Sequence, residues 1–247
     1  MVAVTARDVA GNESRYAAPV RVTLAPIPAQ PGPAIEPGTA RVGVSLTART
    51  GTWLNAPSAL AIAWVRVVDG RRESAGAGAT YTPTRDDARR GARLLVQVVA
   101  TNAAGSASAE SAPLAPVLPA TPVPVATPTV VGVARVDRTV VVAPGAWDDG
   151  GGALAFAYRW EACADLAGTA CSQLAGAGSA LVAPAAALGR RLRVVVTATN
   201  AGGRAEAASA PGEPVLADAP TFARPPRLVG TGAVGAAVDV EPGAVEW

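Results

Sequence analysis

Apolar and polar residues alternate along two long segments of the chain. In 94–100 and again in 192–198, every second residue is apolar, which is the period of a β-strand with one buried face. Upstream, two sets of large apolar residues alternate in the same way: Leu60, Ile62 and Trp64, and Phe156, Tyr158 and Trp160. A period of 3.6 residues is not sustained anywhere, and the Ala-rich stretch 184–189 is where we expect a short helical turn. The pattern predicts an all-β chain.

The alternating segments belong to an internal repeat. Val96 to Gly105 aligns without gaps with Val194 to Gly203, and both contain an Asn and a Gly that favour a tight turn. The segment that begins at Val2 follows the same pattern, at offsets of 94 from Val2 to Val96 and 98 from Val96 to Val194. Earlier in the unit, a second set of segments repeats: Gly38 to Trp53, Gly132 to Trp147 and Gly230 to Gly243. A period of about 95 residues matches the size of a β-sandwich domain.

The phase of the repeat predicts the domain boundaries. The distribution of proline supports boundaries between units in three segments, because 16 of the 22 prolines lie in 26–37, 113–128 and 211–226. Proline-rich segments favour extended, semi-rigid linkers. We therefore predict tandem Greek-key β-sandwiches, two complete and two partial, with about seven strands in each complete unit. The four parts are the C-terminal hairpin of one unit in 1–27, complete units in 28–118 and 119–217, and the N-terminal strands of a further unit in 218–247.

Composition removes several classes of function. The chain has no His, and all 21 basic residues are Arg, so it cannot form a Ser–His, Cys–His or Ser–Lys nucleophile, a Schiff base or a phosphate-loop lysine. A carboxylate pair of the glycosidase kind is still open to the 19 acidic residues, but none lies in a recognisable setting. The net charge of +2 is scattered, which argues against nucleic-acid binding, and no apolar run is long enough to span a membrane. We predict a protein that is not an enzyme and has no catalytic residues, cofactor or bound metal.

The repeated motifs resemble those of a known group of proteins. Gly-x-Trp in 51–53 and 145–147, the later Tyr158-x-Trp160, the paired cysteines and the closing Ala-Thr-Asn-Ala-x-Gly resemble the immunoglobulin-like repeats of large secreted or cell-surface bacterial proteins. Residues 6–14 also resemble the last hairpin of fibronectin type III modules. The resemblance covers nearly the whole chain, implies an extracellular spacer or adhesive role, and brings no catalytic residues with it. The unit 28–118 departs from the pattern, because it lacks both cysteines.

Cys163 and Cys171 are the two cysteines of the chain, and seven residues separate them. We expect a disulfide that fixes the hairpin after the Trp160 strand, with both side chains off the main core; the alternative is two free thiols. A zinc site would need two more ligands, and the chain has no His. The loop-entropy model gives such a bond roughly 2.5 kcal/mol of stabilisation, and the bond would indicate an oxidising compartment.

Other patterns have weaker interpretations. Residues 230–235 match the GxGxxG dinucleotide motif, but the repeat places them between two strands, whereas the motif requires a strand followed by a helix. Asp148 and Asp149 lie in a Gly-rich turn, which we expect to be solvated, because calcium needs six or more oxygen ligands.

The charges in 85–90 predict a solvated loop in which the Arg and Asp side chains pair with one another. Trp53 and Trp147 recur at one repeat position, which favours packing at the end of a domain over a carbohydrate shelf.

These observations lead to a structural function. We predict an extracellular or cell-surface repeat region that acts as a spacer or adhesive stalk of a bacterial surface or secreted protein, with an unidentified extracellular or cell-wall partner. The first residues lack the basic start and apolar stretch of a signal peptide, so we expect any export signal to lie outside this chain. The alternative is a ligand- or carbohydrate-binding accessory module of a secreted enzyme, which would require exposed aromatic residues on one sheet face.

Overall fold

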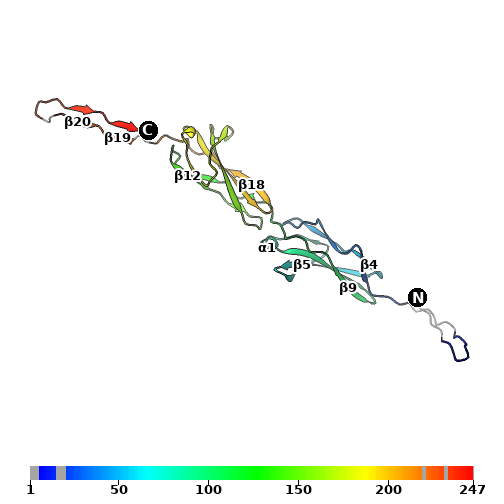
Figure 1. Ribbon diagram of the computed structural model, residues 1–247. Coiled ribbons are helices and arrows are strands. Elements are labelled where there is room, and N and C mark those ends of the chain that lie inside the picture. The colour runs from blue at the N-terminus through cyan, green and yellow to red at the C-terminus, as the bar shows by residue number, and fades with distance from the viewer. Residues whose placement is uncertain (1–5, 15–20, 219–220, 231–232, 247) are drawn as a thin grey trace. The chain divides into compact units, whose positions relative to one another are not determined.

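The computed structural model describes residues 6–14, 21–218, 221–230 and 233–246. Apart from one short α-helix and one 3₁₀ turn, the elements in these ranges are β-strands (Figure 1). The all-β class predicted from the alternation of apolar and polar residues is therefore confirmed. Within the same ranges, no helix has the length and apolarity of a membrane span.

The first sandwich consists of two facing sheets. A three-stranded sheet in the order β2-β3-β7 packs on a four-stranded sheet in the order β6-β5-β8-β9, and β1 pairs with β4 at one end. All of these pairs are antiparallel. Its elements are β1 (Ile27–Ala29), β2 (Ala34–Glu36), β3 (Leu46–Arg49), β4 (Thr52–Leu54), β5 (Ala59–Val68), β6 (Arg71–Ala77), β7 (Thr80–Tyr81), α1 (Arg85–Arg89), β8 (Arg93–Asn102) and β9 (Gly105–Glu110).

The second sandwich repeats this arrangement strand for strand. The sheet β11-β12-β16 packs on the sheet β15-β14-β17-β18, and β10 pairs with β13. Both are immunoglobulin-like β-sandwiches, as the repeat predicted. The elements of the second are β10 (Val123–Pro124), β11 (Thr129–Val131), β12 (Thr139–Ala143), β13 (Trp147–Asp148), β14 (Ala155–Cys163), β15 (Cys171–Gln173), β16 (Ala180–Val182), η1 (Ala185–Ala187), β17 (Arg191–Asn200) and β18 (Gly203–Ala208).

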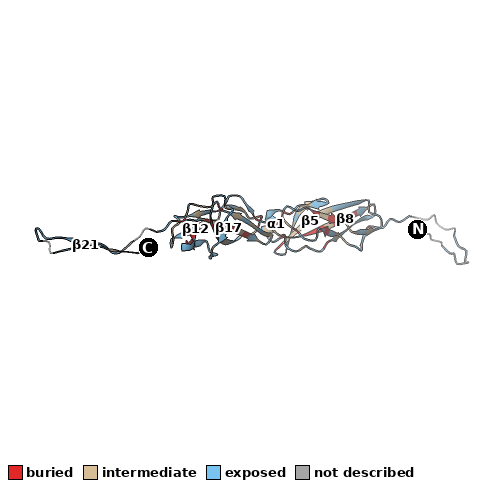
Figure 2. Cartoon of the chain, turned by 90° about the horizontal axis from the view of Figure 1, so that it is seen from above, coloured by how far each residue is buried: buried red, intermediate tan, exposed pale blue. Residues whose placement is uncertain are grey.

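A tryptophan occupies the centre of each core. Trp64 on β5 lies opposite Val96 on β8, and Trp160 on β14 lies opposite Val194 on β17, so the two rings hold the same place in the sheet. Both are fully buried, and each indole N–H donates to a backbone carbonyl oxygen, that of Gly78 at 2.9 Å or of Gly178 at 3.0 Å. Figure 2 shows the buried residues in red inside each sandwich and the exposed residues in pale blue outside.

The two ends of the chain contain parts of further units. Near the C-terminus, β19 (Thr221–Arg224) pairs with β22 (Ala244–Glu246), and β20 (Arg227–Val229) pairs with β21 (Asp239–Glu241). These pairs reproduce β1–β4 and β2–β3 of the first sandwich. Near the N-terminus, an antiparallel bridge between Arg7 and Glu13 closes a hairpin turn, while residues 1–5 and 15–20 of the predicted N-terminal part lie outside the described residues. The fold thus has two complete and two partial units.

The contacts between residues group the chain into two compact units. One unit comprises Met1–Thr121 together with Asp149–Ala153 and Asn200–Gly203, and the other comprises Pro122–Asp148, Leu154–Thr199 and Arg204–Trp247. The boundaries of the four parts, which the repeat phase places at 27/28, 118/119 and 217/218, stay a prediction.

The charged segment 85–90 differs from the expected solvated loop. It forms the helix α1, which begins with a capping box in which Thr84 and Asp87 each bond the other's backbone N–H. Asp87 is fully buried and lies 2.9 Å from Nε of Arg66 in an ion pair. Its Oδ2 also accepts a hydrogen bond from the hydroxyl of Tyr81 at 2.6 Å. The expected helical turn in 184–189 is present as η1.

Candidate functional site

An asparagine clamps the chain that enters the first sandwich. Asn102 ends β8, and its Nδ2 donates to the carbonyl oxygens of Leu24 and Asn55 at 2.8 and 2.9 Å. Its Oδ1 accepts from the backbone N–H of Ala104 at 2.9 Å. One side chain therefore joins the incoming segment, the turn that precedes β5 and the β8–β9 turn.

The same clamp occurs in the second sandwich. Asn200 ends β17, and its Nδ2 donates to the carbonyl oxygens of Ala120 and Asp149 at 2.8 and 2.7 Å. Its Oδ1 accepts from the backbone N–H of Gly202 at 2.7 Å. The sequence indicated the turn-forming role of this asparagine but not its two donations to distant carbonyl groups.

An arginine clamps the chain that leaves each sandwich. Nη1 of Arg41 donates to the carbonyl oxygen of Pro119 at 3.2 Å, and Nη1 of Arg135 donates to that of Ala217 at 2.9 Å. Beside these arginines, the outgoing chain forms two parallel bridges, between Arg41 and Leu118 and between Arg135 and Leu216. Asn102 and Asn200 thus hold the entering chain and Arg41 and Arg135 the leaving chain, and in the first sandwich Nδ2 of Asn55 also donates to the carbonyl oxygen of Ala25 at 2.7 Å.

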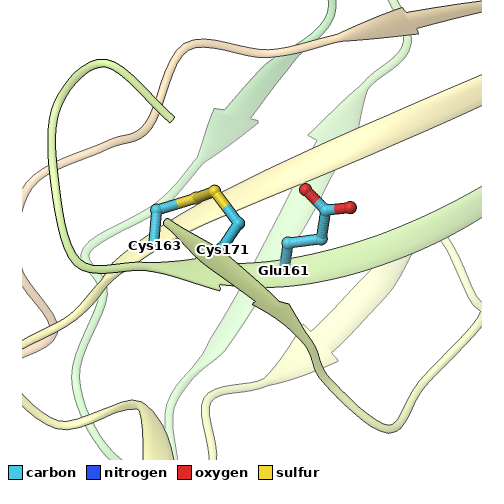
Figure 3. A group of neighbouring side chains, drawn as sticks. All are labelled: Glu161, Cys163 and Cys171. Carbon is cyan, nitrogen blue, oxygen red and sulfur yellow. A yellow bond between two sulfur atoms is a disulfide. The ribbon is translucent and has the colours of Figure 1, made fainter. Parts of the chain in front are cut away.

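A disulfide-closed loop distinguishes the second sandwich from the first. In the first, Asp69 and Gly70 suffice to join β5 and β6, whereas residues 164–170 join β14 and β15. Cys163 and Cys171 lie directly opposite each other on these two strands, with their Cα atoms 3.9 Å apart and their sulfur atoms bonded (Figure 3). Trp160 and the partly buried Leu174 pack in the core cluster, to which neither cysteine belongs. Cys163 is nevertheless fully buried, so the expected outward position of the bond stays a prediction.

Hydrogen bonds brace the loop from inside and from the sheet. The carboxylate of Asp165 accepts from the backbone N–H and the hydroxyl of Thr169 at 3.1 and 2.8 Å, and these bonds lower the pKa of Asp165 below its usual value. Nη1 of Arg193 donates to the carbonyl oxygen of Gly168 at 3.0 Å. Leu166, in contrast, exposes 66% of its surface. The loop is therefore fixed by hydrogen bonds and exposes the apolar side chain of Leu166 to solvent.

A buried carboxylate lies beside the disulfide (Figure 3). Glu161 accepts from Nη2 and Nε of Arg193 at 2.6 and 2.8 Å and from Nε of Arg159 at 3.1 Å. One carboxylate oxygen of Glu161 and the sulfur atoms of Cys163 and Cys171 lie within 4.8 Å of one another, a spacing found in metal sites. Because the sulfur atoms share a covalent bond and two guanidinium groups hold the carboxylate, the cluster instead connects the loop to the sheet.

Of the two aspartates expected in a Gly-rich turn, Asp148 ends the strand β13, whereas Asp149 lies in the turn that follows it. Asp149 accepts a hydrogen bond from the backbone N–H of Gly151 at 2.8 Å, and this bond contributes most to lowering its pKa. The GxGxxG residues connect the antiparallel strands β20 and β21, and two of them, 231 and 232, lie outside the described residues. The described part of this connection contains no helix, so the phosphate-binding arrangement of the motif is missing there.

Trp53 and Trp147, which recur at one repeat position, pack close to the backbone. Both are half-buried, and their indole N–H groups donate to carbonyl oxygens three residues earlier, Trp53 to Thr50 at 3.0 Å and Trp147 to Pro144 at 2.9 Å. Trp147 also lies 6.2 Å from Phe156, measured between ring centroids. The repeated hydrogen bond supports a packing role for this position.

Comparison with known proteins gives structural likenesses alone. No family model and no curated protein matches the chain. Three N-terminal domains of the highly immunogenic outer capsid protein Hoc of bacteriophage RB49 are 14% identical, with a TM-score of 0.41, 76% of this chain covered and 71% of that one. The N-terminal four Ig domains of Dscam1 isoform 4.44 are 13% identical, with a TM-score of 0.32 and coverages of 85% and 51%.

A third similar structure is that of the titin domains I67–I69, in an E-to-A mutated variant. It is 16% identical, with a TM-score of 0.31 and coverages of 87% of this chain and 77% of that one. All three TM-scores are below 0.5, and the fold assignment therefore rests on the sheet order and register described above.

Proposed function

We propose that this chain is a non-catalytic structural repeat region, a spacer or adhesive stalk of a bacterial surface or secreted protein. The observation that carries the proposal is the recurrence of both clamps, one on the entering chain and one on the leaving chain, in two sandwiches of identical topology. A disulfide is typical of proteins in oxidising compartments, which supports a place outside the cell.

The clamps suit a part that carries tension. A spacer must pass a pull from the chain that enters a unit to the chain that leaves it without unravelling. At each exit, the arginine's hydrogen bond and the backbone bonds of a parallel bridge hold the outgoing segment alongside the segment that contains the arginine. When a force pulls along the outgoing segment, it acts on all of these hydrogen bonds at once. They must therefore break together rather than one after another.

Single-molecule pulling on the whole chain tests the proposal. We expect Arg41→Ala and Arg135→Ala each to lower the force at which one sandwich unfolds, because each removes a side-chain bond to the leaving chain. Arg41→Ala also removes the bond from Nη1 of Arg41 to the carbonyl oxygen of Gly202 at 2.6 Å, so Arg135→Ala is the cleaner of the two variants. Arg204→Ala, which removes an exposed arginine on β18, is the matched control and should leave the forces unchanged. Wild-type forces in both clamp variants would remove the main support for a load-bearing role.

A second candidate function is ligand binding by the loop 164–170. The observation that favours it is the braced loop with Leu166 exposed at 66%, which has no counterpart in the first sandwich. Retention of the whole chain on immobilised cell-wall polysaccharide tests this ligand-binding function. The variant is Leu166→Asp, and the control is Leu188→Asp, which changes another exposed leucine of the same sandwich. Retention that only Leu166→Asp abolishes supports the binding module, and equal behaviour of all three proteins counts against it.

A further inference from the structure

One outer sheet face of the second sandwich is apolar. Val131 on β11, Val141 on β12 and Val182 on β16 expose 49%, 45% and 55% of their surfaces. Val131 lies directly opposite Val141, and Val141 lies opposite Ala180 on the third strand. Side chains alternate along a strand, and the residues between these, such as Val140 and Leu181, are buried in the core. The three valines therefore point outward from adjacent strands.

The whole face lacks ionisable side chains. Its outward positions on the three strands, which the register defines, are Thr129, Val131, Thr139, Val141, Ala143, Ala180 and Val182. We call this set the valine face. A sheet with one solvated side normally carries polar residues on that side, so three exposed valines at its centre are a departure that needs a reason.

The other two units carry charges at the same positions. In the first sandwich, Arg49 and Glu36 occupy the outward positions of β3 and β2 and form an ion pair at 2.6 Å. In the C-terminal hairpin, Arg227 and Glu241 lie opposite each other and also pair at 2.6 Å. The internal comparison shows that this fold accommodates an ion pair across these strands, so the valine face is particular to the second sandwich.

We propose that the valine face is a contact surface for the valine face of a second copy of this chain. Two identical faces can meet across a two-fold axis when they are self-complementary, and a face without charges brings no like charges together. An acidic or basic partner would find no ionic group to pair with. Sheets also pack on sheets through β-branched and small side chains, as β11-β12-β16 already does on its inner side.

The size of the face determines the strength of the contact. Three short strands spaced about 4.8 Å apart offer much less area than a standard stable interface requires. The self-association is therefore weak and depends on concentration. Copies held close together on one surface would gain from the high effective concentration. This inference does not depend on the proposed spacer function, since lateral contact and load-bearing are separate properties.

Analytical ultracentrifugation of the full chain from about 10 µM to about 1 mM tests the inference. We expect the weight-average mass of the wild-type chain to rise toward that of a dimer within this range. Val141→Lys, which places a charge at the centre of the face on both copies, should weaken the association at least tenfold. Thr47→Lys, at the equivalent position of the first sandwich, is the matched control and should associate like the wild type.

A second measurement locates the contact. In amide NMR spectra of the full chain, dilution should shift the resonances of 129–131, 139–143 and 180–182 and leave those of 34–36 and 46–49 in place. Melting curves identify any loss of folding in Val141→Lys, in which case Val141→Thr, which keeps the shape and adds a hydroxyl, replaces it with the same expected direction. A wild-type chain that stays monomeric at about 1 mM overturns the inference, and so does an equal effect of the two lysine variants.

Discussion

At the scale of the residue, the two sandwiches share a backbone conformation at one repeat position but differ there in residue type. Ala56 and its counterpart Gly150 each follow the residue whose carbonyl oxygen accepts from the clamping asparagine. Both have positive φ, +41° for Ala56 and +62° for Gly150. A residue with a Cβ atom in this left-handed region costs about 1 kcal/mol relative to glycine. The first sandwich therefore retains a strain that the second avoids.

We expect Ala56→Gly to raise the free energy of unfolding of the first sandwich by about 0.5–1 kcal/mol, because it relieves this strain. Gly150→Ala should lower that of the second by about 2 kcal/mol or more, because the added Cβ would also collide with the carbonyl oxygen of Ala120. Urea unfolding of the whole chain measures both changes. Ala61→Gly, within the regular strand β5, is the control and should destabilise; a stabilising Ala61→Gly would mean that strain is not the cause.

At the scale of the element, the alternation of apolar and polar residues was sufficient to predict the long strands. It could not predict a very short helix or hydrogen bonds between residues far apart in the sequence. The period of two identified β8 and β17. The helix α1 has five residues, too few for a 3.6-residue period to show, although Thr84 and Asp87 provide the spacing of a capping box. The clamps escaped prediction because Asn102 bonds a carbonyl group 78 residues away, and a turn already explained its presence.

Opening the Cys163–Cys171 bond should affect the second sandwich alone. Reduction, or the double substitution Cys163→Ser and Cys171→Ser, should lower the free energy of unfolding by roughly 2.5 kcal/mol, since the unfolded chain regains the entropy of the closed loop. Hydrogen exchange should accelerate in β14 and β15 and stay constant in β5 and β6. Titration of the unreduced, unfolded chain should find no thiol, and two reactive thiols there would contradict the bond.

The loop should respond to acid through Asp165. Because the hydrogen bonds from Thr169 lower the pKa of Asp165 in the folded chain, the charged carboxylate stabilises the loop. This contribution is present above the pKa of the unfolded chain and is lost as the pH falls through the lower folded value. Carboxyl NMR titration should place Asp165 below an ordinary aspartate, and Thr169→Val should move its pKa upward. An unchanged pKa in Thr169→Val would rule out the hydroxyl as a contributor.

At the scale of the whole molecule, stability should vary from one part of the chain to another. In the two sandwiches, 94–100 and 192–198 lie in strands whose alternate residues are fully buried between two sheets. In the C-terminal hairpin, Leu228 and Val240 lie opposite each other and expose 73% and 63% of their surfaces. A two-stranded hairpin without a facing sheet is at best marginally stable.

Amide hydrogen exchange of the chain should reflect this difference. We expect slow exchange in 94–100 and 192–198, which open only when a whole sandwich unfolds, and fast exchange in β20 and β21, which have few buried contacts to lose. The measurement is a mass-spectrometric time course at one pH, with both sets of peptides in the same sample. Comparable protection of the hairpin would show that something else covers its apolar side.

The clamps have a consequence for how such a chain can evolve. Both Asn102 and Asn200, and both Arg41 and Arg135, bond the segments that enter and leave through backbone carbonyl oxygens. Every residue type carries that carbonyl group, so the neighbouring sequence can drift without loosening a joint. Duplication or deletion of a whole unit by recombination would recreate the same bonds at the new junction. Lineages could therefore change the number of units, and with it the reach of the protein, in a single genetic event.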